Sequence, residues 1–122
     1  MLVEIDFDST EALYMQLHNQ IIIQIAQSVL HEGDQLPSVR SMADEIGINM
    51  HTVNKAYSLL RREGYVKIDR RSGAKVDVEY RQDSDEKEIS DELYLLVAKA
   101  RCKGISRDTL HKLVDEHYGK RN

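Results

Sequence analysis

A chain of 122 residues can form one compact domain, or one small domain with an appendage, but it is too short for a large catalytic domain. Its hydrophobic content of 41% and charged content of 31% are ordinary for a folded protein and exclude a disordered chain. The single cysteine, Cys102, excludes an internal disulfide and a multi-thiolate metal site. Packing or a partner subunit must therefore hold the fold together.

The net charge of −4 is distributed unevenly along the chain. Residues 1–35 carry six acids and no Lys or Arg, whereas residues 36–75 carry eight bases and four acids. Only this middle segment is expected to attract phosphate groups. The acidic N-terminus is unlike a signal peptide, and the longest apolar run, 21–23, is too short to span a bilayer. We therefore expect a cytoplasmic protein.

The first predicted helix covers residues 11–30. Apolar side chains recur every four residues, which is typical of an amphipathic helix with one buried face; they are Leu13, Leu17, Ile21, Ile25 and Val29. Ser9 or Thr10 is placed to cap the first turn, because a hydroxyl oxygen can accept a hydrogen bond from a free backbone N–H. Gly33 is expected to end the helix.

Two short helices joined by a glycine turn are predicted next. Pro37 forces an extended conformation on the residue before it, and Ser38 then caps a helix over residues 39–46. The turn Gly47-Ile48-Asn49 leads into a third helix over residues 50–63. This arrangement predicts a helix-turn-helix.

A β-hairpin with a basic tip is predicted after the third helix. Alternating apolar residues on both sides of the polar turn at residues 69–73 indicate two short strands. A hairpin in this position beside a helix-turn-helix is called a wing. Its basic tip could contact phosphate groups.

The C-terminal part is predicted to be a dimerisation tail. Residues 81–88 contain no apolar residue and are predicted to be a linker, which divides the chain into domains 1–80 and 89–122. Two amphipathic helices are predicted in the tail, with a break at Gly104 and a cap at Ser106. Because such a pair cannot cover its own apolar stripes, we expect it to pack on a second copy of the chain. The expected dimerisation residues are Ile89, Leu93, Leu96, Val97, Ala100, Leu110, Leu113 and Val114.

Three spaced motifs lie in and around the predicted helix-turn-helix. Residues 32–40, Glu-Gly-Asp-Gln-Leu-Pro-Ser-Val-Arg, are similar to the Gly-x-x-Leu-Pro-Ser-x-Arg segment in the winged-helix domain of the GntR family of bacterial transcription regulators. Residues 49–57, Asn-Met-His-Thr-Val-Asn-Lys-Ala-Tyr, are similar to its Asn-x-x-Thr-Val-x-Lys-Ala-Tyr recognition helix. Arg62-Glu63-Gly64 resembles the end of that helix, and the short tail resembles the YtrA-type branch. The resemblance covers residues 10–80.

The resemblance implies a mainly α-helical fold with a small β-hairpin, in which an N-terminal winged helix-turn-helix precedes a two-helix C-terminal dimerisation tail. It implies a transcription regulator, a repressor, that binds a palindromic operator in double-stranded DNA as a homodimer. Neither an enzymatic activity nor a cofactor or metal is expected. The residues assigned to DNA binding are Ser38, Arg40, Asn49, His51, Thr52, Asn54, Lys55, Arg70, Arg71, Ser72, Gly73 and Lys75.

Arg40 is the candidate for which chemistry and resemblance agree best. A cation in the first turn of a helix opposes the helix dipole, so an external phosphate or a guanine edge would explain its position. An internal ion pair with Glu11 or Glu32 is the alternative.

The wing departs from the family pattern. The family usually carries Gly-x-Gly-Thr-Phe-Val here, whereas residues 71–76 are Arg-Ser-Gly-Ala-Lys-Val. One glycine and the aromatic residue are missing. This difference favours phosphate contacts by Arg70 and Arg71 over insertion of the wing into a groove.

Two alternatives follow from the same sequence. A winged helix can serve as a protein-interaction module without binding DNA. Asp108, His111 and Asp115 fall on one helix face and could bind a divalent metal, although an exposed Asp-His pair explains them as well. The tail is too small to enclose a metabolite, so an effector would have to lie between subunits or between domains.

Overall fold

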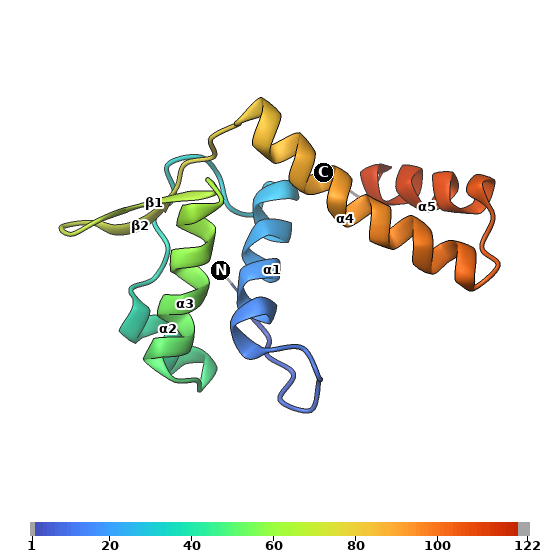
Figure 1. The fold of residues 1–122 in the computed structure, drawn as a ribbon. Helices are drawn as coiled ribbons and strands as arrows, with labels where there is room; N and C mark the ends of the chain where they lie inside the picture. The colour runs from blue at the N-terminus through green and yellow to red at the C-terminus, as the bar shows by residue number, and fades with distance from the viewer. Residues whose placement is uncertain (1, 120–122) are drawn as a thin grey trace. The chain divides into compact units, whose positions relative to one another are not determined.

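The computed structural model describes residues 2–119 and divides into two compact units, Met1–Glu79 and Tyr80–Asn122 (Figure 1). Within the described residues, the first unit contains three helices and a two-stranded antiparallel hairpin, and the second contains two helices. This architecture confirms the predicted fold class. No helix within these residues combines the length and apolar content needed to cross a bilayer.

The first unit is a winged helix-turn-helix. Its elements are α1 (Leu13–Ala26), α2 (Val39–Ile46), α3 (Met50–Arg62), β1 (Val66–Asp69) and β2 (Gly73–Val76). Helix α3 packs against α1, α2 and β1, so it is the central element of the unit (Figure 1).

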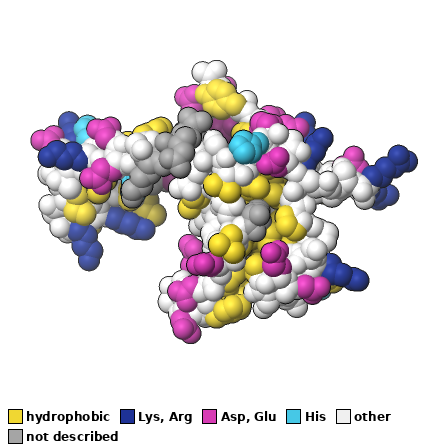
Figure 2. Space-filling model, turned by 180° about the vertical axis from the view of Figure 1, so that it is seen from behind, with side chains coloured by type: hydrophobic (Ala, Val, Ile, Leu, Met, Phe, Trp, Pro, Cys, Tyr) yellow, Lys and Arg dark blue, Asp and Glu magenta, His cyan; other side chains and the backbone are white. Residues whose placement is uncertain are grey.

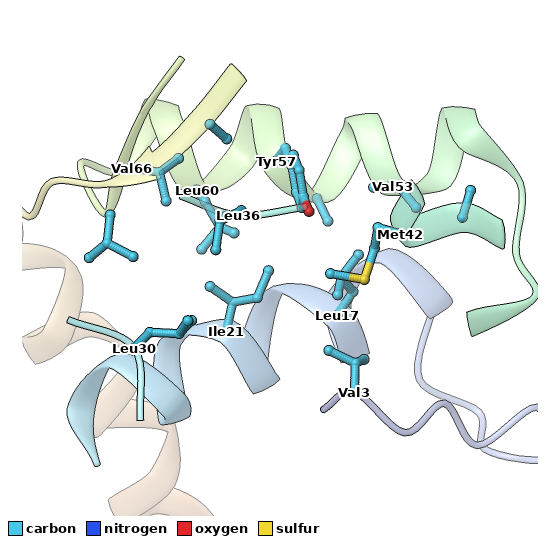
Figure 3. Close-up of a cluster of buried hydrophobic side chains, with 14 residues drawn as sticks. Val3, Leu17, Ile21, Leu30, Leu36, Met42, Val53, Tyr57, Leu60 and Val66 are labelled. Carbon is cyan, nitrogen blue, oxygen red and sulfur yellow. The ribbon is translucent and has the colours of Figure 1, made fainter. Parts of the chain in front are cut away.

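A single hydrophobic core holds these elements together (Figure 3). Leu17 and Ile21 of α1 and Val53 and Leu60 of α3 have no exposed surface. Burial of each such side chain contributes about 1.5–3 kcal/mol relative to exposure. The core residues are Val3, Leu17, Ile21, Leu30, Leu36, Met42, Ala43, Val53, Ala56, Tyr57, Leu60, Val66, Ala74 and Val76.

Helix α1 begins later than the sequence predicted. Neither Ser9 nor Thr10 caps it, because the N-cap position is Ala12, which makes no side-chain capping bond. The buried Gln16 fixes the preceding segment instead. Its Oε1 accepts from the backbone N–H of Asp6 at 2.9 Å, and its Nε2 donates to the Asp6 carbonyl at 3.0 Å. A side chain inside the helix therefore orders the chain outside it.

Helix α1 also ends earlier than predicted. It ends at Ala26, and Ser28 then adopts the left-handed conformation with φ 60. Val29, expected on the buried stripe, is consequently outside the helix and exposed. The predicted terminator, Gly33, lies in a later turn with φ 86.

The helix-turn-helix agrees with the prediction at nearly every boundary. Ser38 caps α2, its Oγ accepting from the backbone N–H of Ser41 at 3.0 Å. Gly47 ends α2 in the left-handed conformation with φ 74, which disfavours residues with a Cβ. Asn49 caps α3, its Oδ1 accepting from the backbone N–H of His51 at 2.7 Å.

Tyr57 ties α3 to the beginning of α2. Burial, together with the charge of Glu45, raises the pKa of Tyr57 above its ordinary value. The hydroxyl therefore stays protonated, and it donates to the carbonyl of Pro37 at 2.8 Å. This bond satisfies a carbonyl that the proline turn leaves outside the helical ladder.

The second unit consists of α4 (Gln82–Cys102) and α5 (Arg107–Gly119). The linker predicted for residues 81–88 is wrong in one respect, because residues 82–88 form the first turns of α4. Asp83 and Asp85 in the first turn interact favourably with the helix dipole, and charged residues of this kind are acceptable helix formers. The absence of apolar residues from 82–88 therefore shows only that these turns have no buried face.

The connection between α4 and α5 agrees with the prediction. Gly104 adopts φ 73, a conformation that breaks a helix, and Ser106 follows it. The Ser106 Oγ accepts from the backbone N–H of Thr109 at 3.1 Å, which is the expected cap.

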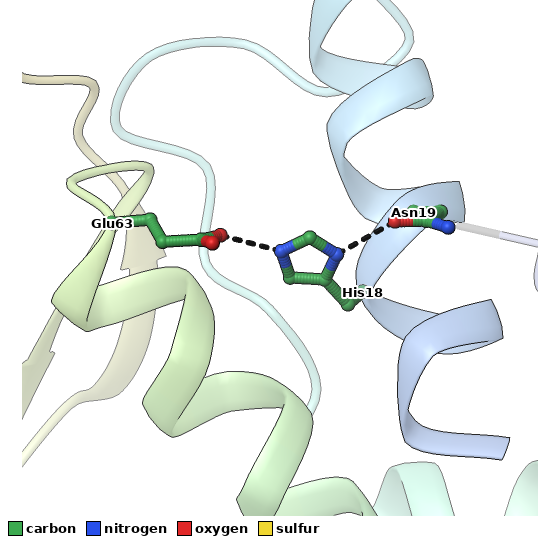
Figure 4. A network of polar contacts seen from close by, with 3 residues as sticks. All are labelled: His18, Asn19 and Glu63. Carbon is green, nitrogen blue, oxygen red and sulfur yellow. Dashed lines mark hydrogen bonds and ion pairs between the residues drawn. The ribbon is translucent and has the colours of Figure 1, made fainter. Parts of the chain in front are cut away.

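A polar contact joins α1 to the end of α3 (Figure 4). His18 is buried, and its Nε2 lies 2.5 Å from Oε1 of Glu63, the C-cap residue of α3. The other ring nitrogen, Nδ1, lies 2.7 Å from Oδ1 of Asn19. Removing the imidazole would leave a carboxylate that is only 22% exposed without this partner.

We predict that His18→Ala lowers the free energy of unfolding by about 1–3 kcal/mol, because a half-buried carboxylate loses its hydrogen-bond donor. Urea denaturation at neutral pH measures this change. His31→Ala is the control, since His31 pairs with Asp34 at the surface and should contribute little. Equal stability of both variants would contradict a stabilising role for the His18 contact.

Candidate nucleic-acid interface

Helix α3 has one buried and one exposed face. The buried stripe is Val53, Ala56, Tyr57 and Leu60. His51, Lys55 and Arg62 lie on the opposite face, since they are separated by four and seven residues, and all three are exposed. The first turn contains no acidic residue. The face therefore presents cationic and hydrogen-bonding groups to the solvent.

Arg62, which is exposed, and Ser58, which is half-buried, were not among the sequence-based candidates, although both lie on this side of α3. Ser58 is three residues beyond Lys55, and Arg62 is four residues beyond Ser58. Helical spacing from His51 would have identified both, because residues three and four apart share a face. The motif quoted for the recognition helix covers residues 49–57 and therefore ends before both positions.

Two candidates already have a structural role at the helix ends. Ser38 and Asn49 accept the capping hydrogen bonds of α2 and α3. Both remain exposed. Thr52 is half-buried, while Asn54 is exposed.

Lys55 is held by helix α1. Its Nζ lies 4.0 Å from the centroid of the Tyr14 ring, which is a cation–π contact. Tyr14 is partly buried against the hydrophobic core, so the ring is a fixed support. The contact positions the ammonium group at the α1 side of the exposed α3 face.

Arg40 is an exposed residue in the first turn of α2. Within residues 2–119 it forms no ion pair, and the suggested pair with Glu11 or Glu32 is absent. Glu32 accepts instead from the backbone N–H of Val78 at 2.8 Å. The internal explanation for Arg40 is therefore wrong.

The wing ends in a short basic turn. Asp69 lies opposite Gly73 in the hairpin register, and its Oδ1 accepts from the backbone N–H of Arg71 at 2.8 Å. Gly73 has φ 75, which favours glycine at this position. The turn residues, Arg70 to Ser72, are exposed, as is Lys75. Figure 2 shows Lys and Arg side chains at the end of the projecting hairpin.

The wing is anchored to the chain that enters α2. Residues 33–36 run beside β2, and Gln35 forms a β-bridge with Lys75. The N–H of Gly33 donates to the carbonyl of Val76, and the N–H of Leu36 donates to the carbonyl of Ala74, both at 2.8 Å. The wing and the start of α2 therefore share one hydrogen-bonded ladder.

The second unit exposes most of its predicted dimerisation residues. Ala100 is the exception: it is 6% exposed within this chain, so it does not belong to a free surface. Leu110 is half-buried. The exposed members are Ile89, Leu93, Leu96, Val97, Leu113 and Val114.

The described part of the chain does not bring metal ligands together. No group of three His, Cys, Asp or Glu side chains within residues 2–119 is arranged to hold a metal ion. The suggested set of Asp108, His111 and Asp115 is therefore not assembled.

The helix-turn-helix, its exposed basic face and its anchored wing define a winged-helix transcription regulator. Residues 13–76 match the family profile described as bacterial regulatory proteins, gntR family. The chain is also 30% identical over 118 residues to the HTH-type transcriptional repressor YtrA of Bacillus subtilis, which covers 94% of this chain and 91% of that protein. The chain belongs to the GntR family of bacterial regulatory proteins and is YtrA-like. It is a transcription regulator rather than an enzyme.

Two solved structures resemble the whole chain. YtrA from Sulfolobus acidocaldarius, a GntR-family transcription factor, is 31% identical and covers 97% of each chain with a TM-score of 0.60. A transcriptional antiterminator from Listeria monocytogenes EGD-e is 27% identical and covers 96% of this chain and 90% of that chain with a TM-score of 0.86. Both similarities include the C-terminal helices, because each extends over nearly the full length.

Proposed function

We propose that this regulator represses transcription by binding a palindromic operator in double-stranded DNA as a homodimer in the cytoplasm. The observation that carries the proposal is the cationic surface of the first unit, where the α3 face, Arg40 and the wing leave their basic groups exposed. The similar B. subtilis protein YtrA is named a repressor, which supports the direction of regulation.

Helix α3 is proposed to enter the major groove. The exposed N-terminal part of a recognition helix is the part that usually contacts base edges. His51 and Asn54 can donate hydrogen bonds to bases, while Lys55, held over Tyr14, is suited to a phosphate at the side of the groove. Thr52 is half-buried and would contribute less.

Arg40 and the wing are proposed to contact DNA on either side of α3. Among the described residues no acid pairs with the guanidinium of Arg40, which is therefore suited to bind a guanine edge or a phosphate. Arg70, Arg71 and Lys75 would bind phosphates without reading the sequence. Ser72 and Gly73 would let the turn approach the DNA backbone closely.

The tail is proposed to join two copies of the chain. Six apolar side chains on α4 and α5 keep a third or more of their surface exposed within the described residues, and a folded protein normally hides such a surface in an interface. A twofold dimer presents two recognition helices and matches a palindrome. Joining two weak contacts can raise the affinity by on the order of 10²–10⁴.

Arg40→Ala should weaken operator binding by about 1–3 kcal/mol, because one base or phosphate contact is lost. Fluorescence anisotropy with an operator selected from a random DNA pool measures the effect. Arg107→Ala is the matched control, since Arg107 is an exposed arginine in the first turn of α5. Unchanged operator affinity, or a much lower melting temperature, would contradict the proposed role of Arg40.

Replacing Arg70 and Arg71 together by Ala should weaken binding to operator and random DNA alike. Loss of two phosphate contacts should reduce the slope of log K against log salt by about 1.8. Titrations at several salt concentrations measure that slope. A changed sequence preference with an unchanged slope would place the arginines on base edges. Absence of any salt-sensitive DNA binding by the unmodified protein would support the alternative of a protein-interaction module.

Leu93→Glu combined with Leu96→Glu should convert the dimer into a monomer, because charges would replace about half-exposed apolar side chains in the interface. Sedimentation at micromolar concentration measures the mass. Ile23→Glu is the control, since Ile23 is similarly exposed but lies on α1. A monomeric unmodified protein would overturn the dimer proposal.

A further inference from the structure

Helix α4 has a strong charge gradient along its length. Its first half, residues 82–92, contains six acids and one base, whereas residues 93–102 contain two bases and no acid. The single base of the first half, Lys87, already pairs with Asp91 of the same helix at 2.9 Å. The acids are Asp83, Asp85, Glu86, Glu88, Asp91 and Glu92, and the bases are Lys99 and Arg101, followed by Lys103.

The exposed apolar stripe lies at the middle of this gradient. It runs from Ile89 to Val97, so its centre nearly coincides with the centre of α4 (Gln82–Cys102). An open groove lies beside this stripe and shares Leu93 and Val97 with it. The groove is lined by Ser90, Leu93, Tyr94, Val97, Ala98, Arg101 and Cys102. The groove is apolar in the middle and basic at its C-terminal end.

We propose that α4 of a second copy occupies this groove in the antiparallel direction. The inference rests on the proposed homodimer and specifies its geometry. If the two apolar stripes are centred on each other, Arg101 lies opposite the turn of the partner subunit that holds Asp85 and Glu86. The acidic half of each helix then faces the basic half of the other. Parallel pairing would instead place acids against acids and bases against bases.

The length of α4 supports the same arrangement. A helix of 21 residues is about 30 Å long. Antiparallel pairing separates the N-terminal ends of the two α4 helices by about that length. Half-sites one DNA turn apart are separated by about 34–36 Å. Parallel pairing would bring these two ends together and would not provide this separation.

The native Cys102 reports the orientation directly, because it is the single cysteine, is exposed, and lies at the end of α4. We expect pulsed electron paramagnetic resonance on the spin-labelled full-length dimer to give a distance on the order of 25–30 Å between the two labels. A distance below about 15 Å, or rapid disulfide formation between two Cys102 residues, would indicate parallel helices. That result overturns the orientation but leaves the proposed homodimer intact.

Charge reversal gives an independent test with the same protein. Lys99→Glu with Arg101→Glu should weaken the dimer at least about tenfold at low salt, because acids would then face acids. Adding Asp83→Lys and Glu86→Lys to the same chain should restore dimerisation. Lys112→Glu, on α5, is the control for a change in net charge. Circular dichroism confirms that each variant remains helical.

The outcomes of these experiments separate the two proposals. The unmodified dimer should weaken as salt rises, whereas a parallel dimer should tighten. Failure of the second pair of substitutions to restore dimerisation in a helical variant would overturn the antiparallel geometry. A monomeric unmodified protein would overturn both this inference and the proposed homodimer.

Discussion

The winged unit depends on the ladder formed by residues 33–36 and β2. This segment follows the turn after α1 and leads directly into Pro37 and the start of α2. One extended segment therefore fixes the hairpin and the second helix to each other. Without it, the two-stranded hairpin would be marginal, because an isolated hairpin has too few contacts to be stable in water. The wing tip can project from the unit because its base is held in this way.

Helix α3, like the wing, is held in place by contacts with the rest of the unit. Its buried stripe packs against α1, α2 and β1, while Tyr57 and Glu63 form polar bonds at its two sides. The exposed face is consequently presented by a rigid helix rather than by a loop. A rigid support lowers the entropy that must be lost when side chains bind a partner. Lys55 gains further order from its contact with Tyr14.

The sequence predicted elements whose signals are local. Ser38, Gly47 and Asn49 mark helix ends through bonds to neighbouring residues, and these boundaries agree with the structure. The sequence-based prediction failed where contacts between residues farther apart in the chain determine a helix boundary. At the start of α1, for example, the side chain of Gln16 bonds to the backbone of Asp6. The prediction also failed for residues 82–88, because absence of apolar residues does not distinguish a linker from an exposed helix. Burial of Ala100 by its own chain could not be read from helical spacing.

The capping roles of Ser38 and Asn49 limit which positions of such a regulator can be substituted during evolution. Each residue caps a helix and is also proposed to lie beside DNA, so a substitution would alter folding and recognition together. Loss of a cap costs about 0.5–2 kcal/mol, a considerable part of the stability of a small domain. Evolution toward a new operator would therefore proceed more freely at His51, Asn54 and Ser58, whose side chains carry no capping bond. The cap positions would remain constant while the positions between them vary.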